Sequence, residues 1–171
     1  MKNKTDWNAL RDEAYKMACD HGFHDKERSA EEAIELIHCE LAEATESLRK
    51  GEAYHWIAEG GKPEGFYVEL VDAIIRIMDF MGERQIQDAT PESDPYTTVL
   101  SPMELMKQVR WHLCNCAIWS GHSGGLFIRH LRYALFHLVH FLELNKEDVE
   151  ALIREKMAYN ATREYKHGKA F

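Results

Sequence analysis

The sequence predicts an all-α protein, and three observations support this prediction. Apolar residues recur with helical spacing in several long segments. No stretch has the alternation of apolar and polar residues that is typical of strands, and glycine, proline and polar clusters separate the helical segments. At 171 residues the chain is long enough to bury a core of its own, so we expect one domain over residues 1–171.

The clearest helix start lies at Ser29, where Glu32 follows three residues later in the pattern of a capping box. Asn145 is expected to cap the last helix. Loops are expected at 52–63 and 88–102, where glycine, proline and polar residues gather. The predicted helices, in chain order, cover about Asp6–Asp20, Ser29–Gly51, Glu64–Glu83, Met103–Ser120, Leu126–Leu144 and Lys146–Lys166.

Composition narrows the class of protein. The formal net charge of −8 argues against a general nucleic-acid binder, which normally carries a basic surface. The first residues, Met1 to Trp7, contain no apolar run of the kind found in signal peptides. The four cysteines form no Cys-x-x-Cys pair, so we expect reduced thiols and a cytoplasmic protein.

The segment Leu126–Leu144 is about as long as a membrane-spanning helix and strongly apolar. Charged residues and histidines interrupt it, among them Arg129, Arg132 and Glu143. We therefore expect a buried bundle helix or a subunit interface here, and no membrane association.

The most informative motifs are two acidic pairs, Glu40-Leu-Ala-Glu43 and Glu69-Leu-Val-Asp72. Each pair has i,i+3 spacing, so both of its carboxylates project from one side of a helix. Four converging carboxylates are costly unless a cation lies among them. Mg²⁺ is the natural candidate, because it prefers oxygen ligands and keeps positions open for water and phosphate.

On the helix predicted for 29–51, Glu40 lies at the edge of the apolar stripe and Glu43 just beyond it, whereas Glu35 and Glu46 face the opposite side. The next helix is apolar around most of its circumference. Its polar residues fall within roughly 80° of arc; they are Glu69, Asp72, Arg76, Asp79 and Glu83. A narrow solvated strip explains either helix alone, but the two together favour a shared metal site.

The last predicted helix has the opposite charge. Lys156, Asn160, Arg163 and His167 follow i, i+4, i+7, i+11 spacing and share one stripe. Cations near a helix C-terminus also suit the helix dipole, which is the simpler explanation. The functional explanation is a clamp for phosphate groups, with a directional hydrogen bond from the asparagine.

With these residues, the chain resembles the MazG-like all-α nucleoside triphosphate pyrophosphohydrolase superfamily, which is related to dimeric dUTPases. The family's Glu-x-x-Glu and Glu-x-x-Asp helices match Glu40, Glu43, Glu69 and Asp72. The segments Leu41–Gly51, Lys62–Gly65, Glu69–Asp79 and Lys156–Lys169 also resemble family sequences. The chain departs from the compact family core at about 85–144, which reads as an inserted helical segment.

The resemblance implies hydrolysis of a nucleoside triphosphate to a monophosphate and pyrophosphate, as in house-cleaning of the nucleotide pool. The four carboxylates would then hold Mg²⁺, or Mn²⁺ in its place. Glu43 is our first choice for the general base that accepts the proton of the attacking water, and Glu40 is the other catalytic candidate. Lys156, Asn160 and Arg163 contact the phosphates. Asp79 is expected to pair with Arg76 and to hold the metal ligands in position without contacting the metal. Family members generally form homodimers or homotetramers.

Three questions stay open at this point. The nucleobase of the substrate is undetermined. Three aromatic side chains could either stack on it or pack in the core; they are Trp56, Phe66 and Tyr67. The histidines of the insertion fit either a transition-metal site or ordinary packing at an interface; they are His112, His122, His130, His137 and His140. A scaffold that binds nucleotides or a partner without turnover is the alternative to an enzyme.

Overall fold

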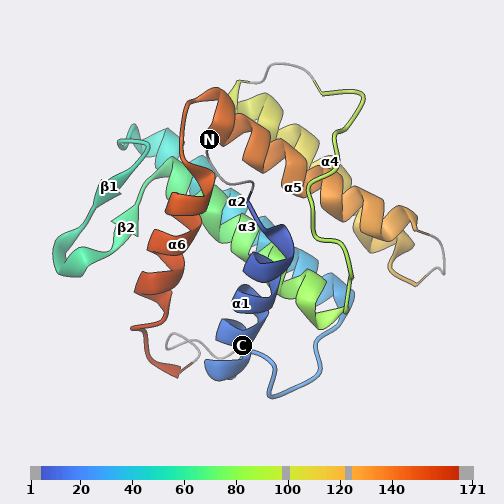
Figure 1. The fold of residues 1–171 in the computed structure, drawn as a ribbon. Coiled ribbons are helices and arrows are strands. Elements are labelled where there is room, and N and C mark those ends of the chain that lie inside the picture. The colour runs from blue at the N-terminus through green and yellow to red at the C-terminus, as the bar shows by residue number, and fades with distance from the viewer. Residues whose placement is uncertain (1–4, 98–100, 122–124, 166–171) are drawn as a thin grey trace.

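The computed structural model describes residues 5–97, 101–121 and 125–165, and within them the chain is all α apart from one short hairpin (Figure 1). The prediction of an all-α fold is confirmed. The helices are α1 (Trp7–Asp20), α2 (Ala30–Lys50), α3 (Phe66–Glu83), α4 (Pro102–Trp119), α5 (Leu126–Leu144) and α6 (Val149–Asn160). Strands β1 (Trp56–Ile57) and β2 (Pro63–Glu64) pair antiparallel across the short 3₁₀ turn η1 (Glu59–Gly61).

Local sequence signals fix several helix ends. The Ser29 side chain accepts the Glu32 backbone N–H and the Glu32 carboxylate accepts that of Ser29, so the expected capping box starts α2. α2 ends at Gly51, which has the left-handed conformation with a φ of 68°. A second capping box, between Ser101 and Glu104, starts α4.

The last helix is shorter than predicted. α6 does not cover Lys146–Lys166, because Asp148 caps its start and the chain turns at its end, where the Arg163 N–H donates to the Asn160 carbonyl. The prediction that Asn145 caps this helix was wrong, since Asn145 instead ends α5. Residue 166 lies outside the described residues.

The loop expected at 52–63 contains the hairpin, which projects from one side of the bundle in Figure 1. Gly65 joins the hairpin to α3 with a φ of 110°. A Cβ at this position would lie 2.4 Å from the Ala53 carbonyl oxygen, so only glycine fits. This junction sets the first turn of α3 directly beside the hairpin.

α3 is the central helix of the bundle, in contact with α1, α2, α5, α6 and the hairpin. Its apolar side chains are buried almost all the way round, as their distribution in the sequence predicts. α4 and α5 run side by side as an antiparallel pair (Figure 1) and meet the rest of the bundle through α2 and α3. No helix within the described ranges combines the length and the apolar character needed to cross a bilayer.

α1 and α3 are packed closely against each other at Gly82. A Cβ built there would lie 2.5 Å from the Tyr15 Cβ, so Gly82→Ala forces the helices apart. Overpacking of this kind costs about 1–3 kcal/mol, and the better helix propensity of alanine offsets about 1 kcal/mol. We expect urea denaturation to show a free energy of unfolding that is lower by about 1 kcal/mol, the middle of the net range of these two effects.

Gly121→Ala is the matched control, because nothing lies within 4 Å of a Cβ at that position. Equal stability of the two variants would contradict this close packing of α1 on α3.

Candidate functional site

A cavity of about 260 Å³ opens between α1, α2, α3 and α6. All nine residues singled out from the sequence line it; they are Glu40, Glu43, Glu69, Asp72, Arg76, Asp79, Lys156, Asn160 and Arg163. The acidic helices and the basic segment therefore meet in space, although more than seventy residues separate Asp79 from Lys156 in the chain. Their chemical roles stay predictions at this point.

Three carboxylates converge on one side of the cavity. Glu40, Glu43 and Glu69 each offer an oxygen, and these oxygens lie within 4.8 Å of one another. Glu40 and Glu69 are buried, whereas Glu43 is exposed. Among the described residues, no lysine, arginine or histidine forms an ion pair with Glu43 or Glu69, so the negative charge here is only partly compensated.

Asp72, the fourth predicted metal ligand, lies apart from this group of three. Its Oδ2 is 2.7 Å from the Lys156 Nζ, in an ion pair that joins α3 to α6. Lys156 is almost completely buried. One of the predicted phosphate contacts is thus held by one of the predicted metal ligands in the free protein.

Arg76 compensates part of the charge of α2. Its Nε donates to the Glu40 Oε1 at 2.8 Å, and its guanidinium lies 5.8 Å from the centre of the Phe23 ring. The predicted pairing of Arg76 with Asp79 was therefore wrong. The reason is that α2 packs close enough to α3 to bring Glu40 within reach of the arginine.

Asp79 belongs to a second polar group at the far end of α3. It accepts hydrogen bonds from the His24 Nε2 at 2.6 Å and the Arg28 Nη2 at 3.2 Å, and Glu83 accepts from Arg28 at 2.9 Å. The hydrogen bond to Asp79, followed by the interaction with Glu83, raises the pKa of His24 to about 9, and burial and Arg28 oppose this change. The acidic strip of α3 is therefore divided into a cavity half and a half fixed to the α1–α2 loop.

Burial also changes the acidity of the converging carboxylates. Desolvation, followed by the negative charge of Asp72, raises the pKa of Glu69 to about 8, and Lys156 opposes this change. The pKa of Asp72 is also raised, chiefly by desolvation. Glu69 is only 7% exposed, and a cation placed beside it would offset the cost of its ionisation.

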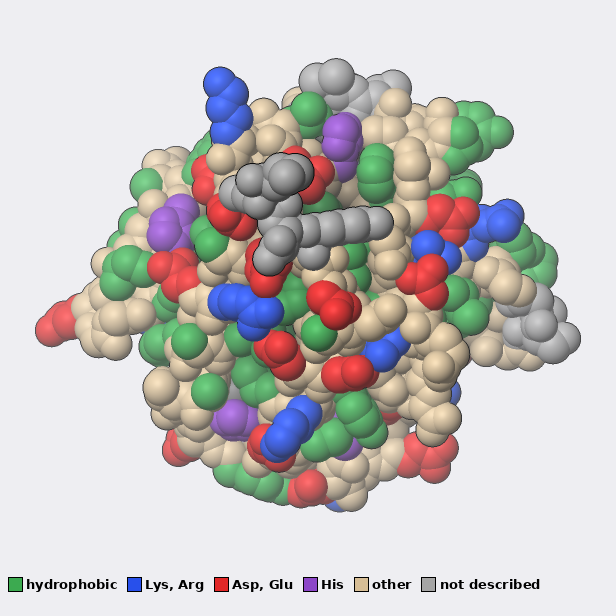
Figure 2. All heavy atoms as spheres, viewed as in Figure 1, with side chains coloured by type: hydrophobic (Ala, Val, Ile, Leu, Met, Phe, Trp, Pro, Cys, Tyr) green, Lys and Arg blue, Asp and Glu red, His purple; other side chains and the backbone are tan. Residues whose placement is uncertain are grey.

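The other wall of the cavity carries the donors. Asn160 is buried with its Oδ1 unpartnered among the described residues. Arg163 reaches the cavity from the turn after α6, and Lys62 reaches it from the hairpin. On the face drawn in Figure 2, acidic and basic side chains are interspersed. Residues 166–169, including His167 of the predicted stripe, lie outside the described residues.

The apolar part of the cavity was not foreseen. Its residues are Ala14, Met17, Ala18, Phe23 and Ile75. None of the aromatic residues considered for base stacking lines it, and Phe66 is fully buried in the core. No pattern in the sequence indicates Phe23, His24 or Arg28, because they lie in a loop without periodicity and acquire their partners only through the packing of α1 and α2 on α3.

Comparison of this chain with protein-family models, with curated proteins and with solved structures finds no match. The described residues form an all-α bundle in which a carboxylate cluster faces cations across one cavity.

The raised pKa of Glu69 predicts how the metal-free protein responds to pH. The native state holds the Glu69 proton up to about pH 8, whereas the unfolded chain releases it near 4.5, so stability is lost as pH rises between these values. In EDTA at pH 8, we expect Glu69→Gln to raise the free energy of unfolding by on the order of 2 kcal/mol. The gain should disappear near pH 4.5 and below, where the unfolded chain binds the Glu69 proton as the native state does.

Chemical denaturation of both proteins across this pH range measures the effect. Glu35→Gln, an exposed glutamate of α2, is the control. An equal gain at both ends of the pH range would show that Glu69 is not the titrating group.

Proposed function

We propose that this protein is a Mg²⁺-dependent nucleoside triphosphate pyrophosphohydrolase, which converts a nucleoside triphosphate to the monophosphate and pyrophosphate. The observation that carries the proposal is the cavity, in which three converging carboxylates face lysine, arginine and asparagine side chains. The resemblance to MazG-like enzymes gives the class of reaction. The site fits that reaction, because a polyphosphate needs both a divalent cation and positive side chains.

The donor set suits a hard cation. Glu40, Glu43 and Glu69 supply only carboxylate oxygens, which Mg²⁺ prefers, with Mn²⁺ as a substitute. Asp72 lies in the same cavity and is paired with Lys156. It would become available as a fourth metal ligand if a phosphate group bound Lys156 in its place. When bound, the cation offsets the charge of the phosphate oxygens and lowers the pKa of a coordinated water.

The residues of the chain divide the remaining tasks. Glu43 is exposed and has no ion-pair partner in the described part of the chain, so it is placed to accept the proton of the attacking water. Lys156, Asn160 and Arg163 bind phosphate oxygens and stabilise the pyrophosphate as it leaves. Arg76 holds the Glu40 carboxylate in place through its hydrogen bond.

Asp79 acts at one remove. It fixes the loop that carries Phe23 by binding His24, so the apolar wall of the cavity keeps its shape. This wall is where the base of the nucleotide would pack. We also propose that the protein self-associates as a homodimer or homotetramer, because α4 exposes the apolar side chains of Met103, Trp111 and Ile118.

A non-catalytic nucleotide-binding scaffold is the alternative function. The unpartnered Glu43 disfavours it, because a site that only binds an anion does not need an extra uncompensated carboxylate. The two functions differ in whether pyrophosphate is released.

The decisive assay is pyrophosphate release from a panel of ribo- and deoxyribonucleoside triphosphates with Mg²⁺. We expect release from at least one of them, and loss of it in EDTA. Glu43→Gln should lower kcat by at least about 100-fold, because it removes a metal ligand and the proposed base together. Glu35→Gln on the outer side of α2 should retain full activity.

Nucleotide binding without release from any member of the panel would favour the scaffold. Equal kcat values for the Glu43→Gln and Glu35→Gln proteins would contradict the proposed role of the carboxylates.

A further inference from the structure

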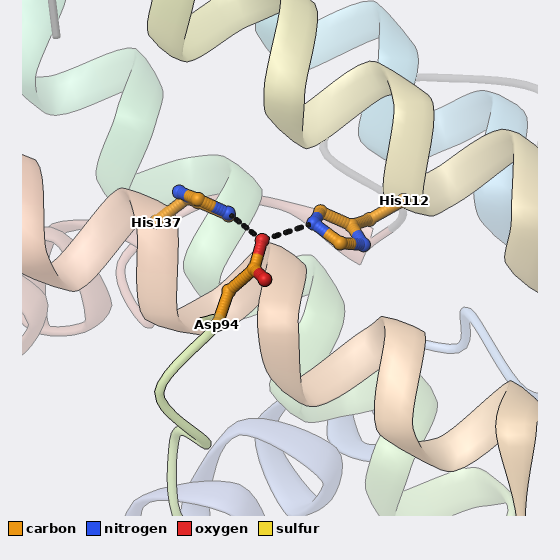
Figure 3. Close-up of side chains that lie close together, drawn as sticks. All are labelled: Asp94, His112 and His137. Atoms are coloured by element: carbon orange, nitrogen blue, oxygen red, sulfur yellow. Dashed lines mark hydrogen bonds and ion pairs between the residues drawn. The ribbon is translucent and has the colours of Figure 1, made fainter. Parts of the chain in front are cut away.

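A second cluster of metal-ligating side chains lies outside the cavity, between α4, α5 and the loop that precedes α4. The Oδ2 of Asp94 is 3.1 Å from the Nε2 of His112 and 2.9 Å from the Nε2 of His137 (Figure 3). All three side chains are buried, with His137 completely inaccessible. None of them lines the cavity described above.

The histidines of the insertion are therefore not simply interface residues. His112 and His137 point inward from neighbouring helices toward one carboxylate oxygen (Figure 3). His130 joins the cluster through its Nδ1, which lies 3.1 Å from the Nδ1 of His112. His122 lies outside the described residues.

The donor atoms suit a transition-metal ion. Two imidazole nitrogens and one carboxylate oxygen form a mixed ligand set that is typical of Zn²⁺. The three atoms already lie within 4.8 Å of one another. Ligand atoms around a tetrahedral zinc ion are about 3.3 Å apart, so the two nitrogens need to move only a few tenths of an ångström from the oxygen.

The charge of the cluster also favours a cation. The other buried carboxylates, except Glu69, each have a positive partner, such as Arg76 for Glu40 or Arg28 for Asp79. Within the described residues, no lysine or arginine forms an ion pair with Asp94. Burial lowers the pKa of His112 to about 4 and also lowers that of His137, so neither ring supplies a positive charge near neutral pH.

The surrounding contacts orient the donors as in a built metal site. The Tyr96 backbone N–H donates to the Asp94 Oδ1 at 3.0 Å, which leaves Oδ2 directed at the histidines. The His130 Nδ1 lies where it can accept a hydrogen bond from the Nδ1–H of His112. Such a bond fixes the tautomer of a ligating imidazole and leaves its Nε2 free to bind the metal. The Nδ1 of His137 has no partner in the described chain, so no contact opposes the same tautomer there.

We propose that Asp94, His112 and His137 form a second metal site that binds Zn²⁺ or a similar divalent transition-metal ion. Each imidazole binds through Nε2 and keeps its proton on Nδ1, so the ion replaces the two hydrogen bonds to Asp94. The three ligands are buried and lie outside the cavity, so we assign the ion a structural role, with a water molecule as the fourth ligand of the tetrahedron. The ion fastens the segment 84–97 to α4 and α5, where Arg132 also holds this segment through the Thr90 carbonyl.

Co²⁺ is the probe for this site, because its visible absorption is intense in a tetrahedral nitrogen and oxygen site and weak in an octahedral site of oxygens. The full-length protein is stripped with a chelator, dialysed into excess Mg²⁺ to fill the acidic cavity, and titrated with Co²⁺. We expect one tightly bound Co²⁺ per chain with the intense absorption, displaced by Zn²⁺, and a higher Tm with either ion.

Variants assign the site. His112→Gln and His137→Gln should lose the absorption, and Asp94→Asn should weaken Co²⁺ binding by at least about tenfold. His140→Gln, on the same helix but outside the cluster, is the matched control and should keep it. Asp94→Asn is nearly isosteric and still accepts hydrogen bonds, so it decides the question if circular dichroism shows that the histidine variants do not fold.

Absence of the absorption in the wild-type protein would overturn the proposal and leave a buried hydrogen-bond network. Unchanged affinity in Asp94→Asn would overturn it as well. A Glu43→Gln, Glu69→Gln double variant should bind Co²⁺ with the same absorption. This site and the proposed nucleotide chemistry can therefore fail independently.

Discussion

The structure depends on how the carboxylates of α3 are compensated. This helix is the centre of the bundle, yet it carries four acidic residues, Glu69, Asp72, Asp79 and Glu83, on one face. Two neighbouring elements supply cations to that face: α6 brings Lys156 to Asp72, and the α1–α2 loop brings His24 to Asp79 and Arg28 to both Asp79 and Glu83. Burying a carboxylate without a partner is costly, so these pairs select the packing of α6 and the loop on α3.

The pattern of compensation also locates the site. It is complete at one end of α3 and incomplete at the other, where Glu40 has Arg76 but Glu43 and Glu69 lack any ion-pair partner in the part of the chain described. The uncompensated end is the end that faces the cavity. A divalent cation would compensate the negative charge of the carboxylates in the cavity. A polyphosphate would compensate the positive charge of its lysine and arginine side chains.

Lys156 connects stability with this chemistry. Its ion pair with Asp72 closes α6 onto α3 in the free protein, and both residues face the space that a triphosphate would occupy. Under the proposed function, phosphate binding and metal binding would act on the same pair, because a phosphate would compete for the lysine and a metal would compete for the aspartate. The two ligands should consequently assist each other in binding.

The sequence predicted the helices well, because each has regular apolar spacing and most have caps that can be recognised in the sequence, such as the pattern at Ser29 and Glu32. It also predicted nine of the residues that line the cavity, since i,i+3 and i,i+4 spacing places them on defined faces. It failed where partners come from loops. Phe23, His24, Arg28 and Asp94 have no periodic pattern, and only tertiary packing brings them to their partners.

The same limit explains the last helix. Lys156, Asn160 and Arg163 fit a continuous helix by spacing, yet α6 ends at Asn160 and Arg163 reaches the cavity from the turn that follows. The regular pattern therefore predicted three residues that do line the cavity, although the helix that it implied extends beyond the observed end of α6.

The most direct test of the central claim is a crystal structure with saturating Mn²⁺ and a non-hydrolysable nucleoside triphosphate analogue. We expect an anomalous Mn²⁺ peak within about 2.5 Å of oxygens from Glu40, Glu43 and Glu69, with the phosphates directed toward Arg163 and Lys156. Anomalous peaks elsewhere and none among these carboxylates would contradict the account.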